Sequence, residues 1–255
     1  MNPSDLVENE LKEFTTLKPQ FLYKYHRMNL HLIEMLTSAE LYMSTKFDLN
    51  DPLDSACTIS LENYLNLYFE KYPSLKNNPK HAEIVINCFK WKLERGDNDW
   101  ISDIDESKSK LRVSCFTEDG NNSLMWSHYA ENHTGVCLKF EPAEDPILEK
   151  ALFPVKYTDE LIDAINISDF SISLLTKLRT WEIEKEWRII SDKTKFPFKQ
   201  ESLVEIVLGL RVPNSTMRWF KQFRENVYFM HAPLYKLKIK GNKLVKVDEW
   251  DFEVE

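Results

Sequence analysis

Residues 181–190 read W-E-I-E-K-E-W-R-I-I, and this stretch does most to decide the fold. Three glutamates occupy alternate positions between two tryptophans, which is typical of a β-strand, where successive side chains point to opposite faces. Glu182, Glu184 and Glu186 would then share one face. Burying a row of carboxylates is costly unless the row faces water, a cation or a substrate. Two interpretations stay open: a solvated face on which Arg188 forms a fold-stabilising ion pair, or a carboxylate site built on a rigid element.

Outward from this stretch, strand-like and helix-like segments are interleaved irregularly. This order predicts an α+β fold, a single mixed unit with a central, mostly antiparallel sheet and flanking helices. An N-terminal helix over residues 1–20 would precede one domain over 21–255, with a helical insertion at about 58–110. The predicted strands are 21–25, 40–44, 111–117, 136–140, 155–157, 181–190, 204–209, 227–230, 234–239 and 243–247, and the predicted helices include 29–38, 123–132, 160–180 and 213–225. The predicted core comprises Val113, Phe116, Val136, Leu138, Ile189, Val207 and Leu208.

Composition narrows the classes of function. The chain has 255 residues, of which 43% are hydrophobic and 29% charged, so it should bury a substantial core. It has only 5 glycines and contains neither G-x-G-x-x-G nor G-x-x-x-x-G-K-[ST], which argues against a Rossmann enzyme or a P-loop ATPase. The net charge of −8 argues mildly against broad nucleic-acid binding, although local basic patches occur around 193–199 and 236–246.

The 4 cysteines form no C-x-x-C pair and have no zinc-finger spacing. The polar, acidic start resembles no secretory signal, and no run of 18 apolar residues occurs. We therefore expect free thiols, a cytoplasmic setting and no membrane association. His128 and His133 are five residues apart and would lie on different helix faces, so we expect no metal site.

Four blocks occur in a fixed order along the chain. They are Y-K-Y at 23–25, Y-M-S-T-K-F-D-L-N-D-P at 42–52, S-C-F-T…M-W-S-H-Y-A-E-N-H-T-G-V-C-L-K-F at 114–140, and K-L-R-T-W-E-I-E-K-E-W-R at 177–188. Together they resemble a bacterial and phage family of unknown function, whose members share an F-N-D-P turn, an M-W-x-x-Y-A-x-x-H-x-G block and a K-x-x-x-W-x-x-E-x-E-W/Y-R block. The resemblance covers roughly residues 21 to 240, and the later V-E-I-V-L-G also fits. Leu49 stands where that family usually has phenylalanine.

The same order is similar, more distantly, to the ADP-ribosyltransferase superfamily. Leu22-Tyr23-Lys24 would occupy its first strand, where the superfamily has His or Arg in place of the lysine, and Leu41-Tyr42-Met43-Ser44 its second. Far downstream the superfamily has an E-x-E or Q-x-E motif at a strand edge, which Glu184 and Glu186 would match. This resemblance implies NAD as a substrate and a toxin or phage-defence role. Glu186 would stabilise an oxocarbenium-like state, and Glu184 would orient or deprotonate the acceptor.

The resemblance also implies a set of NAD-binding residues. Lys24 and Ser44 would hold phosphate or ribose oxygens, and an aromatic ring would stack on the base. For Trp126 and Tyr129 the alternative is core packing, and for Asn50 it is a structural turn. We expect Glu186 to line a pocket with Lys24 and to lie beside the helix that carries Trp126. The full candidate set is Lys24, Tyr25, Tyr42, Ser44, Asn50, Trp126, Tyr129 and Arg188.

Two other functions stay open. Asp51, Asp54, Glu184 and Glu186 could hold a divalent metal in a nucleic-acid-processing toxin. A tryptophan-rich surface could instead serve a non-enzymatic partner-binding protein. The sequence does not separate a protein acceptor from a nucleic-acid acceptor, and it carries no signal for an oligomeric state.

Overall fold

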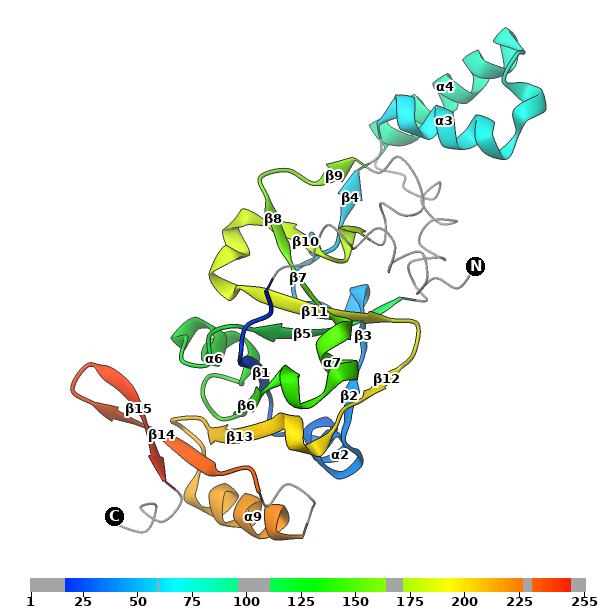
Figure 1. The fold of residues 1–255 in the computed structure, drawn as a ribbon. Helices are drawn as coiled ribbons and strands as arrows, with labels where there is room; N and C mark the ends of the chain where they lie inside the picture. Colours follow the sequence, from blue (N-terminus) through cyan, green and yellow to red (C-terminus); the bar gives the residue numbers. More distant parts are fainter. Residues whose placement is uncertain (1–16, 59, 96–110, 164–171, 227–230, 249–255) are drawn as a thin grey trace. The chain divides into compact units, whose positions relative to one another are not determined.

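The computed structural model describes residues 17–58, 60–95, 111–163, 172–226 and 231–248 (Figure 1). The fold is α+β, as predicted, with helices and a large mixed sheet. The chain divides into two compact units, each assembled from segments distant in sequence. Unit 1 comprises Met1–Thr15, Ser44–Val113 and Val155–Glu182, and unit 2 comprises Thr16–Met43, Ser114–Pro154 and Ile183–Glu255.

Unit 2 is built on the large sheet, whose strand order is β15-β14-β13-β6-β1-β5-β11-β7. β13 and β14 are parallel, whereas the pairs β14–β15, β13–β6, β6–β1, β1–β5 and β11–β7 are antiparallel, as expected of a mostly antiparallel sheet. β5 begins in unit 1 and continues into unit 2. The strands are β1 (Leu22–His26), β5 (Arg112–Thr117), β6 (Val136–Phe140), β7 (Leu152–Pro154), β11 (Glu186–Ser191), β13 (Leu203–Leu208), β14 (Leu234–Lys240) and β15 (Lys243–Asp248).

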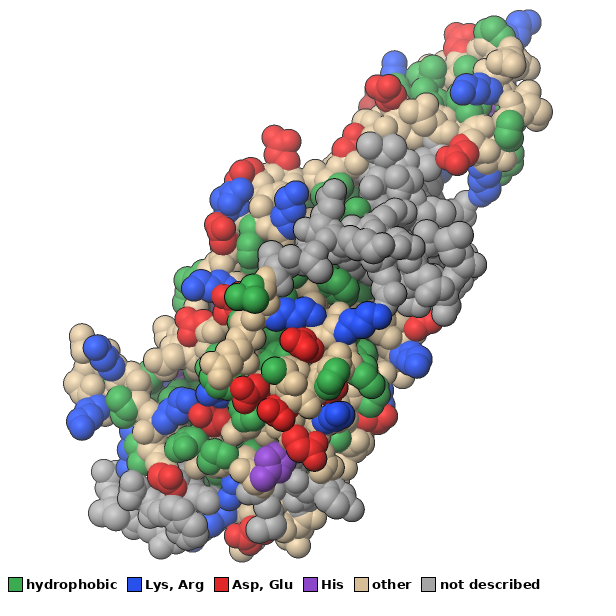
Figure 2. Space-filling view, in the orientation of Figure 1, with side chains coloured by type: hydrophobic (Ala, Val, Ile, Leu, Met, Phe, Trp, Pro, Cys, Tyr) green, Lys and Arg blue, Asp and Glu red, His purple; other side chains and the backbone are tan. Residues whose placement is uncertain are grey.

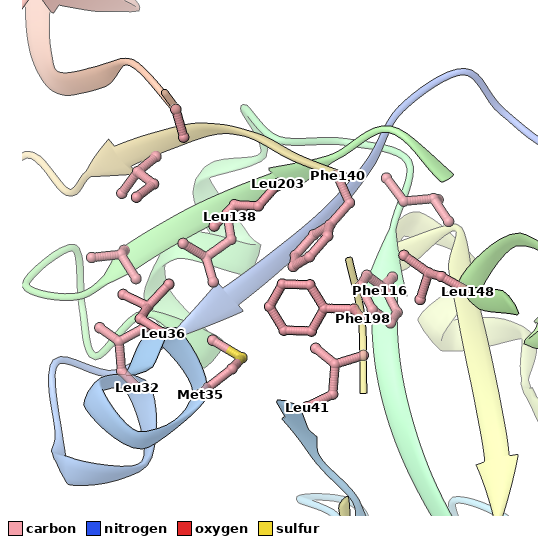
Figure 3. Packing of buried hydrophobic residues seen from close by; sticks show 14 of the residues in the cluster. Leu32, Met35, Leu36, Leu41, Phe116, Leu138, Phe140, Leu148, Phe198 and Leu203 are labelled. Atoms are coloured by element: carbon pink, nitrogen blue, oxygen red, sulfur yellow. The ribbon is translucent and has the colours of Figure 1, made fainter. Parts of the chain in front are cut away.

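The core of unit 2 forms where helices bury their apolar stripes against this sheet. α2 (Leu30–Ser38) begins at Asn29, whose side chain accepts a hydrogen bond from the Leu32 amide, and it directs Leu32, Met35 and Leu36 inward (Figure 3). α9 (Asn214–Glu225) and α7 (Pro146–Ala151) add Met217, Phe220 and Leu148 to the same cluster. All seven predicted core residues are buried: Val113, Phe116, Val136, Leu138, Ile189, Val207 and Leu208.

Aromatic rings fix the packing at the centre of this core. Phe140 meets Phe116 and Phe198 edge-to-face, at centroid distances of 5.5 and 5.3 Å (Figure 3). A two-stranded pair, β2 (Glu40–Tyr42) with β12 (Lys195–Pro197), also belongs to unit 2. The backbone amide of Met43 donates to the Thr194 carbonyl, which extends this pairing by one step.

Unit 1 contains the predicted helical insertion. α3 (Leu61–Lys71) and α4 (Pro79–Glu94) are separated by a 3-10 turn, η3 (Pro73–Leu75), which begins at a proline. Tyr64 and Phe89 stack between the helices at 4.5 Å. The remaining elements are short: β3 (Ser44–Thr45) on the start of β5, η2 (Lys46–Asp48), β4 (Cys57–Thr58) with β9 (Ile162–Asp163), and β8 (Lys156–Thr158) with β10 (Thr176–Leu178).

Two predicted elements are wrong. The strand predicted over 181–190 begins only at Glu186, because the preceding residues form the 3-10 helix η6 (Arg179–Glu184) and Lys185 has a φ of 44°. The helix predicted over 160–180 is replaced, in its described part, largely by β9 and β10. In both places hydrogen bonds to distant residues override the local pattern, as when Trp181 donates to Asp51.

Smaller differences concern the ends of elements. α6 (Ser123–Tyr129) stops short of residue 132, because Glu131, Asn132 and His133 all have positive φ. The helix predicted over 1–20 and the strand over 227–230 fall outside the described residues, except that 17–20 form no helix. None of the helices in the described part of the chain is long and apolar enough to cross a membrane.

Candidate functional site

The junction between η6 and β11 carries the two buried glutamates of the predicted site. Glu184 ends the 3-10 helix and Glu186 begins the strand, and their exposed fractions are 3% and 6%. Between them Lys185 is exposed and has left-handed backbone, a conformation that costs a residue with a Cβ roughly 1–3 kcal/mol. Glu182 is exposed. The three glutamates therefore share no strand face, which corrects the prediction, and only two of them belong to the interior.

Glu186 is held by Arg188, which is two residues farther along the same strand and so on the same face. The Nε and Nη2 atoms of Arg188 donate to the two carboxylate oxygens at 2.7 and 2.9 Å. The guanidinium is fully buried. Such bidentate, charge-assisted pairs fix orientation as well as charge. Glu186 is therefore a rigidly positioned anion, and the fold-stabilising ion pair that the sequence left open is present.

Lys24 lies in the same cluster, and the pocket expected between it and Glu186 stays a prediction. From β1 its ammonium donates to Ser114 Oγ at 2.9 Å and to the Cys115 carbonyl at 3.0 Å, and it lies over the Phe116 ring. Burial lowers the pKa of Lys24, while Cys115 and Glu186 act in the opposite direction. The cluster thus combines two basic side chains with one carboxylate.

Cys115 is the member of this cluster that the sequence did not single out. Burial raises the pKa of its thiol, and the negative charge of Glu186 raises it further, against the opposing effects of Arg188 and Lys24. A raised pKa disfavours the thiolate, which is the form in which a cysteine acts as a nucleophile. The alternation of residues 111–117 predicts the strand, but it does not show that Cys115 lies beside the Glu186 carboxylate.

Glu184 is held from α6 and β5. The Tyr129 hydroxyl donates to Glu184 Oε1 at 2.6 Å, and Thr117 Oγ1 donates to the Glu184 carbonyl at 2.5 Å. The Glu118 amide donates to the Lys185 carbonyl at 3.2 Å, which fixes the strained residue as well. The helix of the M-W-x-x-Y-A block therefore contacts the E-x-E segment, as expected. The half-buried Tyr129 connects Glu184 to the protein surface.

Trp126 and Tyr25 belong to a second apolar cluster of unit 2. The Trp126 ring is fully buried, meets Tyr25 edge-on at 5.1 Å and stacks on His133 at 5.7 Å. The Tyr25 hydroxyl donates to the Asp119 carbonyl. These are the contacts of core packing, the alternative that the sequence left open for Trp126. The same cluster contains Met125, Ala130, Cys137, Val207 and Leu237.

The other candidate residues have different surroundings. Tyr42 is 42% exposed and stacks on His31 at 5.4 Å. Ser44 pairs with Val113 in unit 1, and Asn50 lies in the turn of the same unit. Within unit 2, the structure brings Lys24 and Arg188 together with Glu186. It also brings Tyr129 into contact with Glu184.

Unit 1 contains a buried ion pair that the sequence did not predict. Lys177 Nζ lies 3.3 Å from Asp54 Oδ2, and both side chains are almost fully buried. The Lys177 ammonium also lies 4.9 Å from the centre of the Trp181 ring, whose Nε1 donates to Asp51 at 2.7 Å. The N-D-P turn and the K-x-x-x-W segment are thereby joined. No local sequence pattern signals this contact, because it joins segments that are far apart in the sequence.

The carboxylates of the metal-site alternative have other partners. Asp51 accepts from Trp181 and from the Leu53 amide, and Asp54 pairs with Lys177. Across the described ranges, no group of three or more His, Cys, Asp or Glu side chains is arranged to hold a metal ion.

Comparison with protein families finds a match over the segment that holds the buried glutamates. Residues 125–189 match a family described as a protein of unknown function (DUF2971). The matched segment starts within α6 and ends within β11, so it includes Tyr129, Glu184, Glu186 and Arg188. No curated protein and no solved structure matches the chain. The part of the chain that matches is therefore the part that holds the two buried glutamates.

Proposed function

We propose that this protein is an NAD-dependent ADP-ribosyltransferase-like enzyme, acting as a toxin or phage-defence effector. Its reaction centre would be the carboxylate pair at the η6–β11 junction. One observation carries the proposal: Glu184 and Glu186 are buried on either side of a strained Lys185, and each has its own hydrogen-bond donor. Buried ionisable groups and strained backbone concentrate at functional sites. The resemblance of the blocks supplies the substrate class.

The chemistry suits two carboxylates with different roles. In the first step the bond between nicotinamide and ribose breaks, its electron pair leaves with nicotinamide, and positive charge develops on the ribose. Glu186, fixed by Arg188, would stabilise this oxocarbenium-like state electrostatically. In the second step an acceptor forms the new bond to the ribose carbon and loses a proton, which Glu184 would accept.

The neighbouring groups would position the substrate. Lys24 is partly exposed, and an ammonium that now donates to Ser114 could donate instead to phosphate or ribose oxygens. The exposed ring of Tyr42 would be available for stacking on a base. Tyr129 would hold the Glu184 carboxylate in the orientation required for proton transfer.

Three matched variants test the proposal. Glu186→Gln and Glu184→Gln keep the size of each side chain and remove its charge, and Glu182→Gln makes the same change at an exposed position in the same segment. Nicotinamide release from NAD should fall by about 100-fold or more in the first two variants and stay unchanged in the third. Circular dichroism would verify that each variant is folded. Full activity of folded Glu186→Gln would refute its catalytic role, and loss of wild-type activity with EDTA would favour the metal-dependent alternative.

A further inference from the structure

The hairpin of β14 and β15 presents most of its lysines on one face. The two strands pair in antiparallel register from Tyr235 opposite Asp248 to Lys240 opposite Lys243, and Gly241 has the positive φ that the tight turn requires. Directly paired residues share a face, and alternate residues along a strand do so too. One face therefore carries Lys236, Lys238, Lys240 and Lys243, together with Val245 and Val247. We call this set the lysine face.

The opposite face of the hairpin is the one that anchors it. Leu237 is buried there, and Tyr235 and Leu244 pack against the same apolar cluster. Lys246, also on that side, forms an ion pair with Glu205. The apolar cluster thus accounts for Tyr235, Leu237 and Leu244, and the ion pair with Glu205 accounts for Lys246, whereas Ile239 on the same side is exposed. None of these contacts involves the lysine face.

The lysine face is a concentration of positively charged side chains on one side of the hairpin. Lys236 donates to the Val212 carbonyl, and Lys240 and Lys243 are exposed. No carboxylate of the described residues forms an ion pair with any of the four lysines. Burial lowers the pKa of Lys236, and the nearby charge of Lys238 lowers it further, as expected of like charges on one face. Figure 2 shows Lys and Arg side chains at the end of this hairpin.

We propose that the lysine face binds the phosphate backbone of a nucleic acid. Alternate residues of a strand are about 6.8 Å apart, so Lys236, Lys238 and Lys240 form an evenly spaced row of point charges on β14, suited to a regular polyanion, and Lys243 lies opposite Lys240 on β15. The chain as a whole has a net charge of −8, which makes this local row stand out. Only valines accompany the lysines, and no aromatic ring is present for base stacking. Binding would therefore depend on salt and show little sequence preference.

Fluorescence anisotropy with a labelled single-stranded oligonucleotide tests this surface without NAD, so its outcome is separate from that of the proposed enzyme. The affinity would be measured between roughly 50 and 200 mM salt, and each neutralised phosphate contributes about 0.7 to the slope of log K against log salt. Replacing Lys238, Lys240 and Lys243 together by Gln should reduce that slope by about 2. Lys236 is kept, because its contact with Val212 ties it to the fold.

A charge-matched control is available in unit 1. Lys76, Lys80 and Lys90 are exposed, and replacing them by Gln removes the same charge from the region of α3 and α4. This control should keep the wild-type slope. Absence of wild-type binding would overturn the proposal and leave the lysines as a solvated face of the hairpin. Equal losses in both triple variants would overturn it in favour of bulk charge, and equally tight binding of polyglutamate would favour an acidic protein partner.

Discussion

Replacing Arg188 by Met should expose how strongly the ion pair supports the strand that carries the candidate site. The substitution removes a fully buried guanidinium and its two hydrogen bonds to Glu186, which is itself only 6% exposed. Breaking a buried pair from one side costs about 3–5 kcal/mol, because the remaining charge is left without its partner. Lys24 lies close enough to influence Glu186, so part of the charge stays compensated. We therefore expect a loss of about 3 kcal/mol in the free energy of unfolding, at the lower end of that range.

Urea denaturation followed by tryptophan fluorescence would measure this loss. Adding Glu186→Gln to Arg188→Met should recover part of it, because the second change removes the uncompensated charge. Arg179→Met is the matched control: that arginine pairs with Asp159 and Glu182 on the surface, so stability should hardly change. If Arg188→Met lowers the free energy of unfolding by less than about 1 kcal/mol, the pair contributes no more than an exposed ion pair, and its proposed role in supporting β11 is wrong.

Three further changes test other parts of the fold. Tyr129→Phe removes the donor to Glu184 and should cost about 1–3 kcal/mol of unfolding free energy, measured in urea, together with activity. Burial lowers the pKa of His26 to about 4, so the unfolded chain binds its proton more tightly and stability should fall between about pH 6.5 and pH 4. His26→Gln should weaken that dependence, and an unchanged profile would contradict the assignment. Gly209→Ala would place a Cβ 2.2 Å from the His133 carbonyl oxygen, so thermal unfolding should reveal a loss of about 1–3 kcal/mol.

The sequence predicted the elements whose local pattern and tertiary contacts agree. Val136, Leu138 and Val207 lie in apolar runs that became central strands, and α2 begins after the Asn29 cap. The alternation around Trp181 failed, because the indole donates to Asp51, a residue far away in the sequence. Short-range periodicity carries no information about such a contact, and it also gives no warning that Lys185 adopts left-handed backbone.

The candidate site was predicted in part for the same reason. Spacing along one segment placed Arg188 beside Glu186, since residues two apart share a strand face. The block order associated Lys24 with this carboxylate, and the two lie in one cluster. Cys115 and the Asp54–Lys177 ion pair have no local signal, because strand pairing and buried contacts between distant segments determine them.

The central claim is that the centre formed by Glu184 and Glu186 consumes NAD. The most direct measurement is the release of nicotinamide from NAD labelled in that ring, by the purified wild-type protein in the presence of EDTA. We expect the wild type to release nicotinamide at a rate that depends on protein concentration, and we expect no release by folded Glu186→Gln. Candidate acceptors would be supplied from a cell extract. If the wild type then released nicotinamide no faster than buffer alone, this result would contradict NAD consumption at this centre.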